Sequence, residues 1–422
     1  MTMLPILATL LALAVAAPAP AASILPEARE TAPAGPGPAA QGFAAIARGD
    51  LDAAERHFTA LRQADPAAPA AWLGLAEVAA RRGNVAETER LLRAGIAQAP
   101  HSSHLHRALG RLMAQRGDPE GTVAAFVAAQ QAQPDEALSY FELAEILHER
   151  FGQAERALPF YAAALERDPR HWKAAYGRGL ALARAGRPAE ALSVLAEAAR
   201  LGPHSPLPDY ARAQILMRQN RPQEALAAFD AALARDPELV PARLGKGGVL
   251  LGQGRPRDAI PEFEHALARV PNEVNALLGL GMARQAEGDA VGAEAAFRAV
   301  LARTPQHPIA LNNLAWLTVE RGGDLDEAVR WAEAAVTALP NDPSVITTLG
   351  WVRRARGELP QAEAALAQAV TLQPNADRLT RLAMVRAAMG RRDEALADLR
   401  RALELQPGYA PARQELERIQ RN

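Results

Sequence analysis

The chain has 422 residues, contains no cysteine, and carries 47 basic against 48 acidic residues. The lack of cysteine excludes disulfides, thiol catalysis and cysteine-ligated zinc. The even charge balance provides no field that would attract nucleic acid or an anionic membrane, so we expect no nucleic-acid partner.

The first 22 residues carry no charged side chain and include an apolar run from Leu4 to Ala17. This run is too short to cross a bilayer comfortably but suits the core of a signal peptide, and Ala19 and Ala21 provide an A-x-A cleavage site. We predict a signal peptide over residues 1–21 and a periplasmic or secreted mature protein without a transmembrane span. Because no Lys or Arg precedes the apolar run, an uncleaved membrane anchor and a cytoplasmic protein remain alternatives.

A pattern of 34 residues recurs about eleven times after the N-terminal segment. In the copy from Asn272 to Pro305, two short amphipathic helices are expected to meet at Gly288. A proline cannot donate the next helical hydrogen bond and disfavours helix at the preceding residue, so it closes each second helix. The closing prolines, with three one-residue irregularities in their spacing, are Pro66, Pro100, Pro134, Pro169, Pro203, Pro237, Pro271, Pro305, Pro340, Pro374 and Pro407.

A sharp turn is expected seventeen residues before each closing proline, with one residue in the left-handed region that glycine tolerates freely and asparagine next best. The residues at this position are Gly49, Gly83, Gly117, Gly152, Gly186, Asn220, Gly254, Gly288, Gly323, Gly357 and Gly390.

Each second helix also pairs a small residue with a bulky residue one turn later, as in Ala293 and Phe297. The small residue lets the two helices of a repeat approach, and the bulky one fills the space behind it. The small residues are Ala54, Thr88, Thr122, Ala157, Ala191, Ala225, Ala259, Ala293, Ala328, Ala362 and Ala395. In the ninth repeat Ala332 replaces the bulky residue, with Trp331 beside it.

This unit, with its W-x2-L-G-x2-Y, A-x3-F and P pattern, resembles the tetratricopeptide repeat over residues 39–422. The resemblance implies an all-α, right-handed superhelical solenoid of about eleven helix-turn-helix repeats. We predict a flexible Pro/Ala/Gly linker over residues 22–38, the repeat array over 39–407, and a capping helix within 408–422, from Ala410 to Arg421.

The resemblance also implies that the first helices line a concave groove that takes extended peptides or partner helices. The family's groove positions select aromatic, thioether and polar side chains here, which could hold an apolar peptide stripe. The alternative is that some of them are buried between neighbouring helices. The candidate partner-binding residues are Phe141, Tyr176, Tyr210, Met217, Asn275, Met282, Asn312, Trp316, Trp351 and Arg354.

No pattern for catalysis, metal or a cofactor emerges from the sequence. His101, His104 and His106 do not share one helix face, so we interpret them as surface histidines rather than metal ligands. Arg107 occupies the first position of the carboxylate clamp that some chaperone-binding relatives use, but Arg111 follows where asparagine is needed. We expect a protein that is not an enzyme and that has no cofactor.

The sequence therefore favours a non-enzymatic protein–protein interaction scaffold in the bacterial cell envelope. The NNLAW and TLGW segments of the ninth and tenth repeats resemble exported tetratricopeptide proteins of exopolysaccharide assembly and export. The alternative function is thus an accessory protein that contacts carbohydrate, because aromatic faces also stack on sugar rings.

Overall fold

The computed structural model describes residues 37–421, in which helices joined by short turns and loops are the regular structure and no strand is present. The predicted signal peptide and all of the predicted linker up to residue 36 lie outside the described residues. Helix α2 (Pro38–Arg48) begins at the last residue of the predicted linker. Within the described residues, no helix is long and apolar enough to cross a bilayer.

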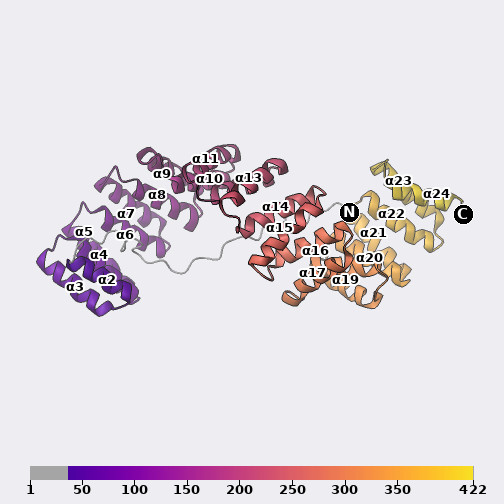
Figure 1. Cartoon of the computed structure of the whole chain (residues 1–422), viewed down its shortest axis with the longest axis horizontal. Helices are drawn as coiled ribbons and strands as arrows, with labels where there is room; N and C mark the ends of the chain where they lie inside the picture. The colour runs from indigo at the N-terminus through magenta and orange to yellow at the C-terminus, as the bar shows by residue number, and fades with distance from the viewer. Residues whose placement is uncertain (1–36, 422) are drawn as a thin grey trace. The chain divides into compact units, whose positions relative to one another are not determined.

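Within residues 37–421, eleven helix pairs follow one another, and one helix is added at the C-terminal end (Figure 1). The first helices are α2, α4 (Pro69–Arg81), α6 (Ser103–Gln115), α8 (Ala137–Glu145), α10 (Trp172–Arg184), α12 (Leu207–Arg218), α14 (Val240–Gly252), α16 (Val274–Glu287), α18 (Pro308–Glu320), α20 (Pro343–Arg356) and α22 (Ala376–Ala388). The second helices are α3 (Leu51–Ala64), α5 (Val85–Gln98), α7 (Pro119–Ala132), α9 (Ala154–Arg167), α11 (Pro188–Leu201), α13 (Pro222–Arg235), α15 (Pro256–Arg269), α17 (Ala290–Arg303), α19 (Leu325–Ala338), α21 (Leu359–Leu372) and α23 (Arg392–Leu405). The capping helix α24 (Ala410–Arg421) has the predicted bounds, and the predicted solenoid of repeats is confirmed.

Local sequence signals set both ends of the second helices. Each of them ends two residues before its closing proline, as predicted. Asp118 and Asp289 begin α7 and α17 as N-caps, because each carboxylate accepts a hydrogen bond from a main-chain N–H of the first turn. Asn220 is one of the predicted left-handed residues between paired helices, and it has a φ of 56°.

The three irregular spacings have three different structural causes. The extra residue between Pro134 and Pro169 lies in the first helix of its repeat, where α8 continues into a π-helical turn (Ile146–Arg150). The missing residue after Pro374 shortens the loop before α22.

The prediction of the left-handed residue in the ninth repeat is wrong, because this repeat contains one extra residue. Gly322, not Gly323, adopts the left-handed conformation, with φ of 65°. The reason is that α18 ends at Glu320, so Gly322 stands directly after the C-cap residue Arg321. Gly323 is the inserted residue between this turn and the N-cap of α19.

The predicted small and bulky residues form the core of the repeats. All eleven small residues are fully buried, and so is Ala332 of the ninth repeat. The bulky ring of one repeat packs against two first helices: a Cβ added to Gly42 or Gly74 would lie 2.6 or 2.4 Å from the ring of Phe58. Phe58 therefore joins its own repeat to the next.

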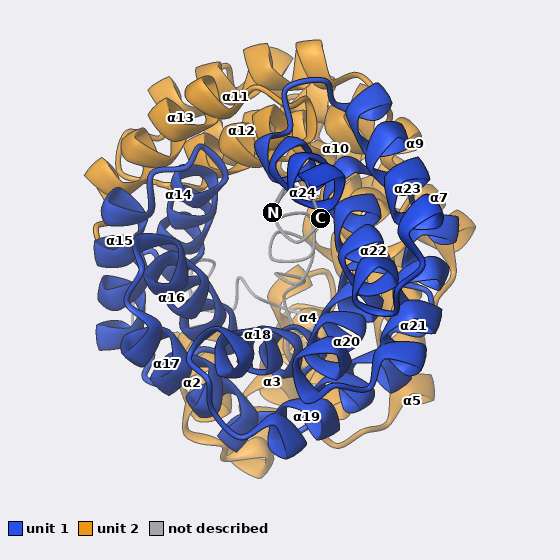
Figure 2. Cartoon of the chain, turned by 90° about the vertical axis from the view of Figure 1, so that its right-hand side faces the viewer, with its two compact units in different colours: residues 1–14, 238–422 blue, residues 15–237 orange. Residues whose placement is uncertain are grey.

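The chain divides into two compact units, shown in orange and blue in Figure 2. Among the described residues, the N-terminal unit comprises residues 37–237 with helices α2–α13. The C-terminal unit comprises residues 238–421 with helices α14–α24, and α24 packs on α22 and α23 at its end. The candidate site lies entirely within the C-terminal unit.

Candidate partner-binding site

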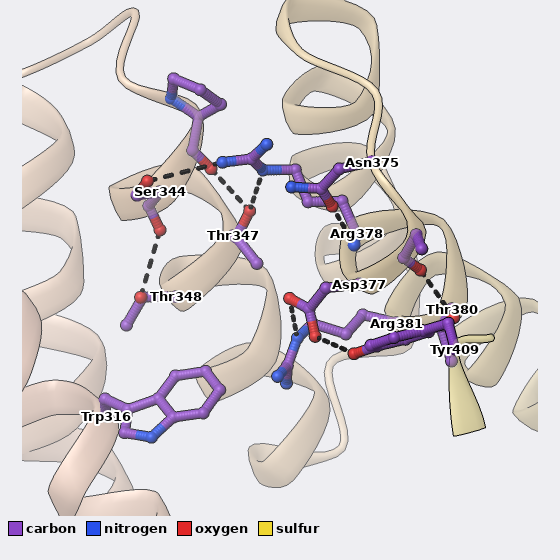
Figure 3. A network of polar contacts seen from close by, with 12 residues as sticks. Trp316, Ser344, Thr347, Thr348, Asn375, Asp377, Arg378, Thr380, Arg381 and Tyr409 are labelled. Carbon is purple, nitrogen blue, oxygen red and sulfur yellow. Dashed lines mark hydrogen bonds and ion pairs between the residues drawn. The ribbon is translucent and has the colours of Figure 1, made fainter. Parts of the chain in front are cut away.

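A pocket of about 640 Å³ lies along consecutive first helices of the C-terminal unit. We call it the arginine–tryptophan pocket. Residues from α16, α18, α20, α22 and the segment before α24 line it: Met282, Gln285, Ala286, Asn313, Trp316, Glu320, Ser344, Thr347, Thr348, Asn375, Ala376, Asp377, Arg378, Arg381, Gln406 and Tyr409. Figure 3 shows the polar contacts among many of these side chains.

Trp316 of α18 and Trp351 of α20 stack on each other, with ring centroids 6.3 Å apart and planes inclined by 21°. The guanidinium carbon of Arg381, from α22, lies 4.6 Å from the Trp316 ring centroid and 4.5 Å from that of Trp351. Both distances are within the range of a cation–π interaction. Three successive first helices thus contribute to one aromatic and cationic cluster.

Two further side chains fix the orientation of Arg381. Its Nε donates to Oδ2 of Asp377 at 2.9 Å, one helical turn earlier. The hydroxyl of Tyr409 donates to the other oxygen, Oδ1, at 3.0 Å (Figure 3). Burial alone would raise the pKa of Asp377, but the hydrogen bonds and positive charge of these partners lower it below its ordinary value. Asp377 is therefore ionised at neutral pH.

Arg378 is buried beside this cluster and is held by neutral partners. Its Nε donates to Oγ1 of Thr347 at 3.2 Å, and its Nη1 donates to the carbonyl oxygen and side-chain oxygen of Gln373 at 3.0 and 3.1 Å. Nη2 donates weakly to Oγ of Ser344 at 3.5 Å. Because burial penalises its charge, the pKa of Arg378 is lowered.

Arg354 of α20 also contacts this aromatic and cationic cluster, with its guanidinium carbon 4.6 Å from the Trp351 ring centroid. Its Nε is buried and makes no hydrogen bond to any of the residues that the structure describes. Burial lowers the pKa of Arg354; the nearby Glu415 opposes this effect, and Arg381 and Arg418 add to it. Stacking on the indole therefore replaces an ion pair at this arginine.

Models of the tetratricopeptide repeat match residues 45–112, 146–206, 210–272, 250–317 and 376–409, which together cover more than half of the chain. The chain belongs to the tetratricopeptide repeat family. The family builds protein–protein interaction scaffolds, and the prediction of this fold is confirmed.

Solved structures of tetratricopeptide proteins resemble the chain at low identity. The APC/C hetero-tetramer Cut9-Hcn1 matches with 15% identity over 90% of this chain and 95% of that chain, at a TM-score of 0.49. A tetratricopeptide repeat protein from Parabacteroides merdae matches with 20% identity over 60% and 99% of the two chains, at 0.48. YrrB, a tetratricopeptide protein described as having an unusual peptide-binding site, matches with 25% identity over 45% and 97%, at 0.40. No curated protein matches the sequence.

Four of the predicted groove residues of this tetratricopeptide protein gather at the pocket. Met282 and Trp316 line it, and Trp351 and Arg354 extend the aromatic cluster. Met282 is almost fully buried, with 2% of its surface exposed, so it contributes to the floor.

The two predicted asparagines differ in their surroundings. Asn312 is buried, and its Nδ2 lies 3.5 Å from Oδ1 of the pocket residue Asn313. Its own Oδ1 makes no hydrogen bond within the described part of the chain. Asn275 of α16 is half-buried and donates to Oε1 of Glu273 at 3.2 Å. Their contact with a partner stays a prediction.

The remaining predicted residues lie in the N-terminal unit and are not part of this pocket. Phe141 is buried in a hydrophobic cluster, against which Tyr176 packs. Tyr210 is half-buried and accepts a hydrogen bond from Gln214 at 2.9 Å. Met217 is also half-buried. These four residues remain predictions of a partner surface in that unit.

Arg107, the residue at the first clamp position, is engaged within the fold. Its side chain is 1% exposed and forms ion pairs with Glu136 and Glu142, each at 2.8 Å. Arg111 also pairs with Glu142. Both arginines of α6 are therefore already paired with carboxylates of the protein itself.

Sequence reasoning missed Arg381, Asp377, Arg378 and Tyr409, which supply the polar part of the pocket. The family's groove positions, when applied to the sequence, gave no residue of the eleventh repeat. One signal was present: Asp377 and Arg381 are four residues apart, the spacing of an acid–arginine pair on one helix face. Tyr409 precedes the capping helix, and no pattern in the sequence relates it to α22.

Proposed function

We propose that this protein is a non-enzymatic scaffold that binds a segment of a partner protein at the arginine–tryptophan pocket. The observation that carries this proposal is the cluster of Trp316, Trp351 and Arg381 beside a pocket of about 640 Å³. Tryptophan and arginine are the residues that contribute most often to the binding energy of protein interfaces. The pocket also runs across several first helices, so it suits an extended segment rather than a compact small molecule.

The contacts within the cluster favour a protein partner over a carbohydrate. A sugar ring would stack on an open indole face, but the two indoles already contact each other and the guanidinium groups of Arg354 and Arg381. Less ring surface therefore remains for a sugar. Side-chain amides of Gln285 and Gln406 line the pocket and can pair with the N–H and C=O groups of a peptide backbone.

The test is photo-crosslinking in living cells with a photoreactive amino acid placed at Gln285 or Gln406, both of which line the pocket. Gln361, exposed on the second helix α21, is the matched position outside the pocket. We expect one discrete protein to crosslink from the two pocket positions and not from Gln361. The crosslink should disappear when Trp316→Ala and Trp351→Ala are combined.

A control separates loss of binding from loss of folding. Trp331→Ala removes a third tryptophan from the same region, but Trp331 belongs to the second helix α19 and does not line the pocket. This variant should retain the crosslink, and all variants should show a helical circular dichroism spectrum with cooperative unfolding. If the crosslinked partner persists in the folded double-alanine variant, the pocket is not the binding site.

We further propose that the scaffold acts in the bacterial cell envelope, in the periplasm or outside the cell. The apolar run from Leu4 to Ala17 and the small residues at Ala19 and Ala21 support export. Fractionation followed by N-terminal sequencing tests this. Cleavage after Ala21 in a periplasmic or secreted fraction is the expected result; an intact N-terminus in the membrane fraction indicates an anchor, and one in the cytosol contradicts export.

A further inference from the structure

We propose that the arginine–tryptophan pocket selects a partner segment that carries a carboxylate side chain, and that the two terminal nitrogens of Arg381 bind this carboxylate. The inference rests on the proposed function, because it names the chemistry of the segment that the same pocket accepts. It follows from how Arg381 is held, from the local charges and from the groups that surround it.

Arg381 lines the pocket, and among the described residues its guanidinium group is hydrogen-bonded at Nε only. Asp377 accepts a hydrogen bond from its Nε, and the two indole rings contact its guanidinium group. Among residues 37–421, no hydrogen bond or ion pair uses Nη1 or Nη2 of Arg381. A guanidinium group presents its nitrogens in a planar fork that matches the two oxygens of a carboxylate. Because the side chain is already fixed, little conformational entropy is lost on binding.

The charged side chains of Arg378, Arg381 and Asp377 favour a ligand group that carries one negative charge. Arg378 and Arg381 contribute two positive charges, and Asp377 neutralises one of them. The hydrogen bonds of Arg378 go to neutral groups, and the carboxylates of Asp377 and Asp342 act on its charge without bonding to it. Glu320 also lines the pocket, but it is exposed to water and accepts a hydrogen bond from Nε1 of Trp316 at 2.6 Å.

The same charges disfavour a phosphate group. A doubly charged phosphate would be repelled by Asp377, which accepts the hydrogen bond of Arg381, and by Glu320. A carboxylate carries one negative charge, which balances the net positive charge of Arg378, Arg381 and Asp377. The segment is therefore expected to contain Asp or Glu at the position that enters the pocket, rather than a phosphorylated residue.

The test uses heptapeptides with acetylated and amidated ends, so that terminal charges are absent. The central residue is Glu, Asp, Gln, Asn or phosphoserine, and the flanking residues are randomised. Peptides are selected on the immobilised full chain and counted by mass spectrometry, and the affinity of selected peptides is then measured from tryptophan fluorescence. Oligogalacturonate serves as an acidic carbohydrate probe in the same assay.

We expect central Glu or Asp to be enriched at least about tenfold over Gln or Asn on the wild-type chain, which corresponds to about 1.4 kcal/mol. Arg381→Gln should abolish this preference, and Arg381→Lys should reduce it because lysine lacks the planar fork. Arg400→Gln, at an exposed position on the second helix α23, should retain it. The preference should also weaken as salt is added.

Several results would overturn the inference. Equal enrichment of Glu and Gln, a preference that survives Arg381→Gln, or stronger selection of phosphoserine each contradicts carboxylate recognition by Arg381. Binding of oligogalacturonate without selection of any acidic peptide would assign the site to carbohydrate. If the cellular crosslink maps to the pocket while Glu and Gln bind equally, the scaffold proposal stands and only the carboxylate proposal fails.

Discussion

Gly281 of α16 and Phe297 of α17 fit together without room for a methyl group between them. A Cβ added to Gly281 would lie 2.6 Å from Cε1 of Phe297, which is itself fully buried. The absence of a side chain at residue 281 therefore sets how closely the two helices of this repeat approach. The contact provides two direct tests of the packing.

We expect Gly281→Leu to destabilise the C-terminal unit by roughly 1–3 kcal/mol, because the added side chain collides with the Phe297 ring in a closely packed core. Urea unfolding followed by circular dichroism measures the change. Gly408→Ala is the matched control, because a Cβ at Gly408 meets nothing within 4 Å. Equal stabilities of the two variants would contradict this account of the helix contact.

We expect Phe297→Ala to cost roughly 3–5 kcal/mol, because it leaves a cavity where a fully buried ring packs against Gly281 of α16. Val291→Ala, on the same helix as Phe297 but at a side chain that is 67% exposed, should change the stability by less than about 0.5 kcal/mol. Chemical denaturation of both variants at equal temperature provides the comparison. A small effect of Phe297→Ala would mean that the neighbouring helices collapse into the space.

His148 in the π-helical turn should make stability depend on pH. Its side chain is 1% exposed. Among residues 37–421, neither ring nitrogen has a hydrogen bond of suitable geometry, although Nδ1 lies 3.1 Å from Oε1 of Glu149. Burial lowers the pKa of His148; Glu149 opposes this effect and Arg184 adds to it. The unfolded chain then binds the proton more readily than the folded chain. The stabilising contribution is present above the ordinary pKa of 6.5 and is lost as the pH falls below it.

The measurement for His148 is urea unfolding at pH 7.5 and pH 5, for the wild type and for His148→Gln. The decrease in unfolding free energy between the two pH values should be smaller in the variant, because one of the groups that gains a proton on unfolding has been removed. His171 and His307 remain in both proteins, so their effects cancel in the comparison. An unchanged pH dependence would show that His148 does not titrate with unfolding.

Tyr409 should affect stability at the opposite end of the pH scale. Burial, together with the charge and hydrogen bond of Asp377, raises the pKa of Tyr409 to about 12. Because the folded chain holds the phenolic proton more tightly than the unfolded chain, the contribution is complete below pH 10 and is lost as the pH rises toward about 12. Tyr409→Phe should therefore lose less stability than the wild type between pH 9 and pH 11. A steeper loss in the variant would contradict the hydrogen bond to Asp377.

The repeat register could be predicted because its signals are local. Closing prolines such as Pro305 and left-handed residues such as Asn220 constrain the backbone within a few residues, whatever the rest of the chain does. The burial of Ala293 and Phe297 followed from their spacing on one helix. The error at Gly323 arose because a fixed count from the next proline cannot tell on which side of a turn an inserted residue lies.

The sequence by itself therefore determined the family, the number of repeats and the residues that pack within each repeat. The tertiary structure alone decided which side chains from different repeats meet. Arg381 contacts Trp316 and Trp351 across three first helices, and Tyr409 reaches Asp377 from the segment before the capping helix. These contacts depend on the angle and offset between successive helix pairs, which arise from the packing of many side chains and have no short-range signal in the sequence.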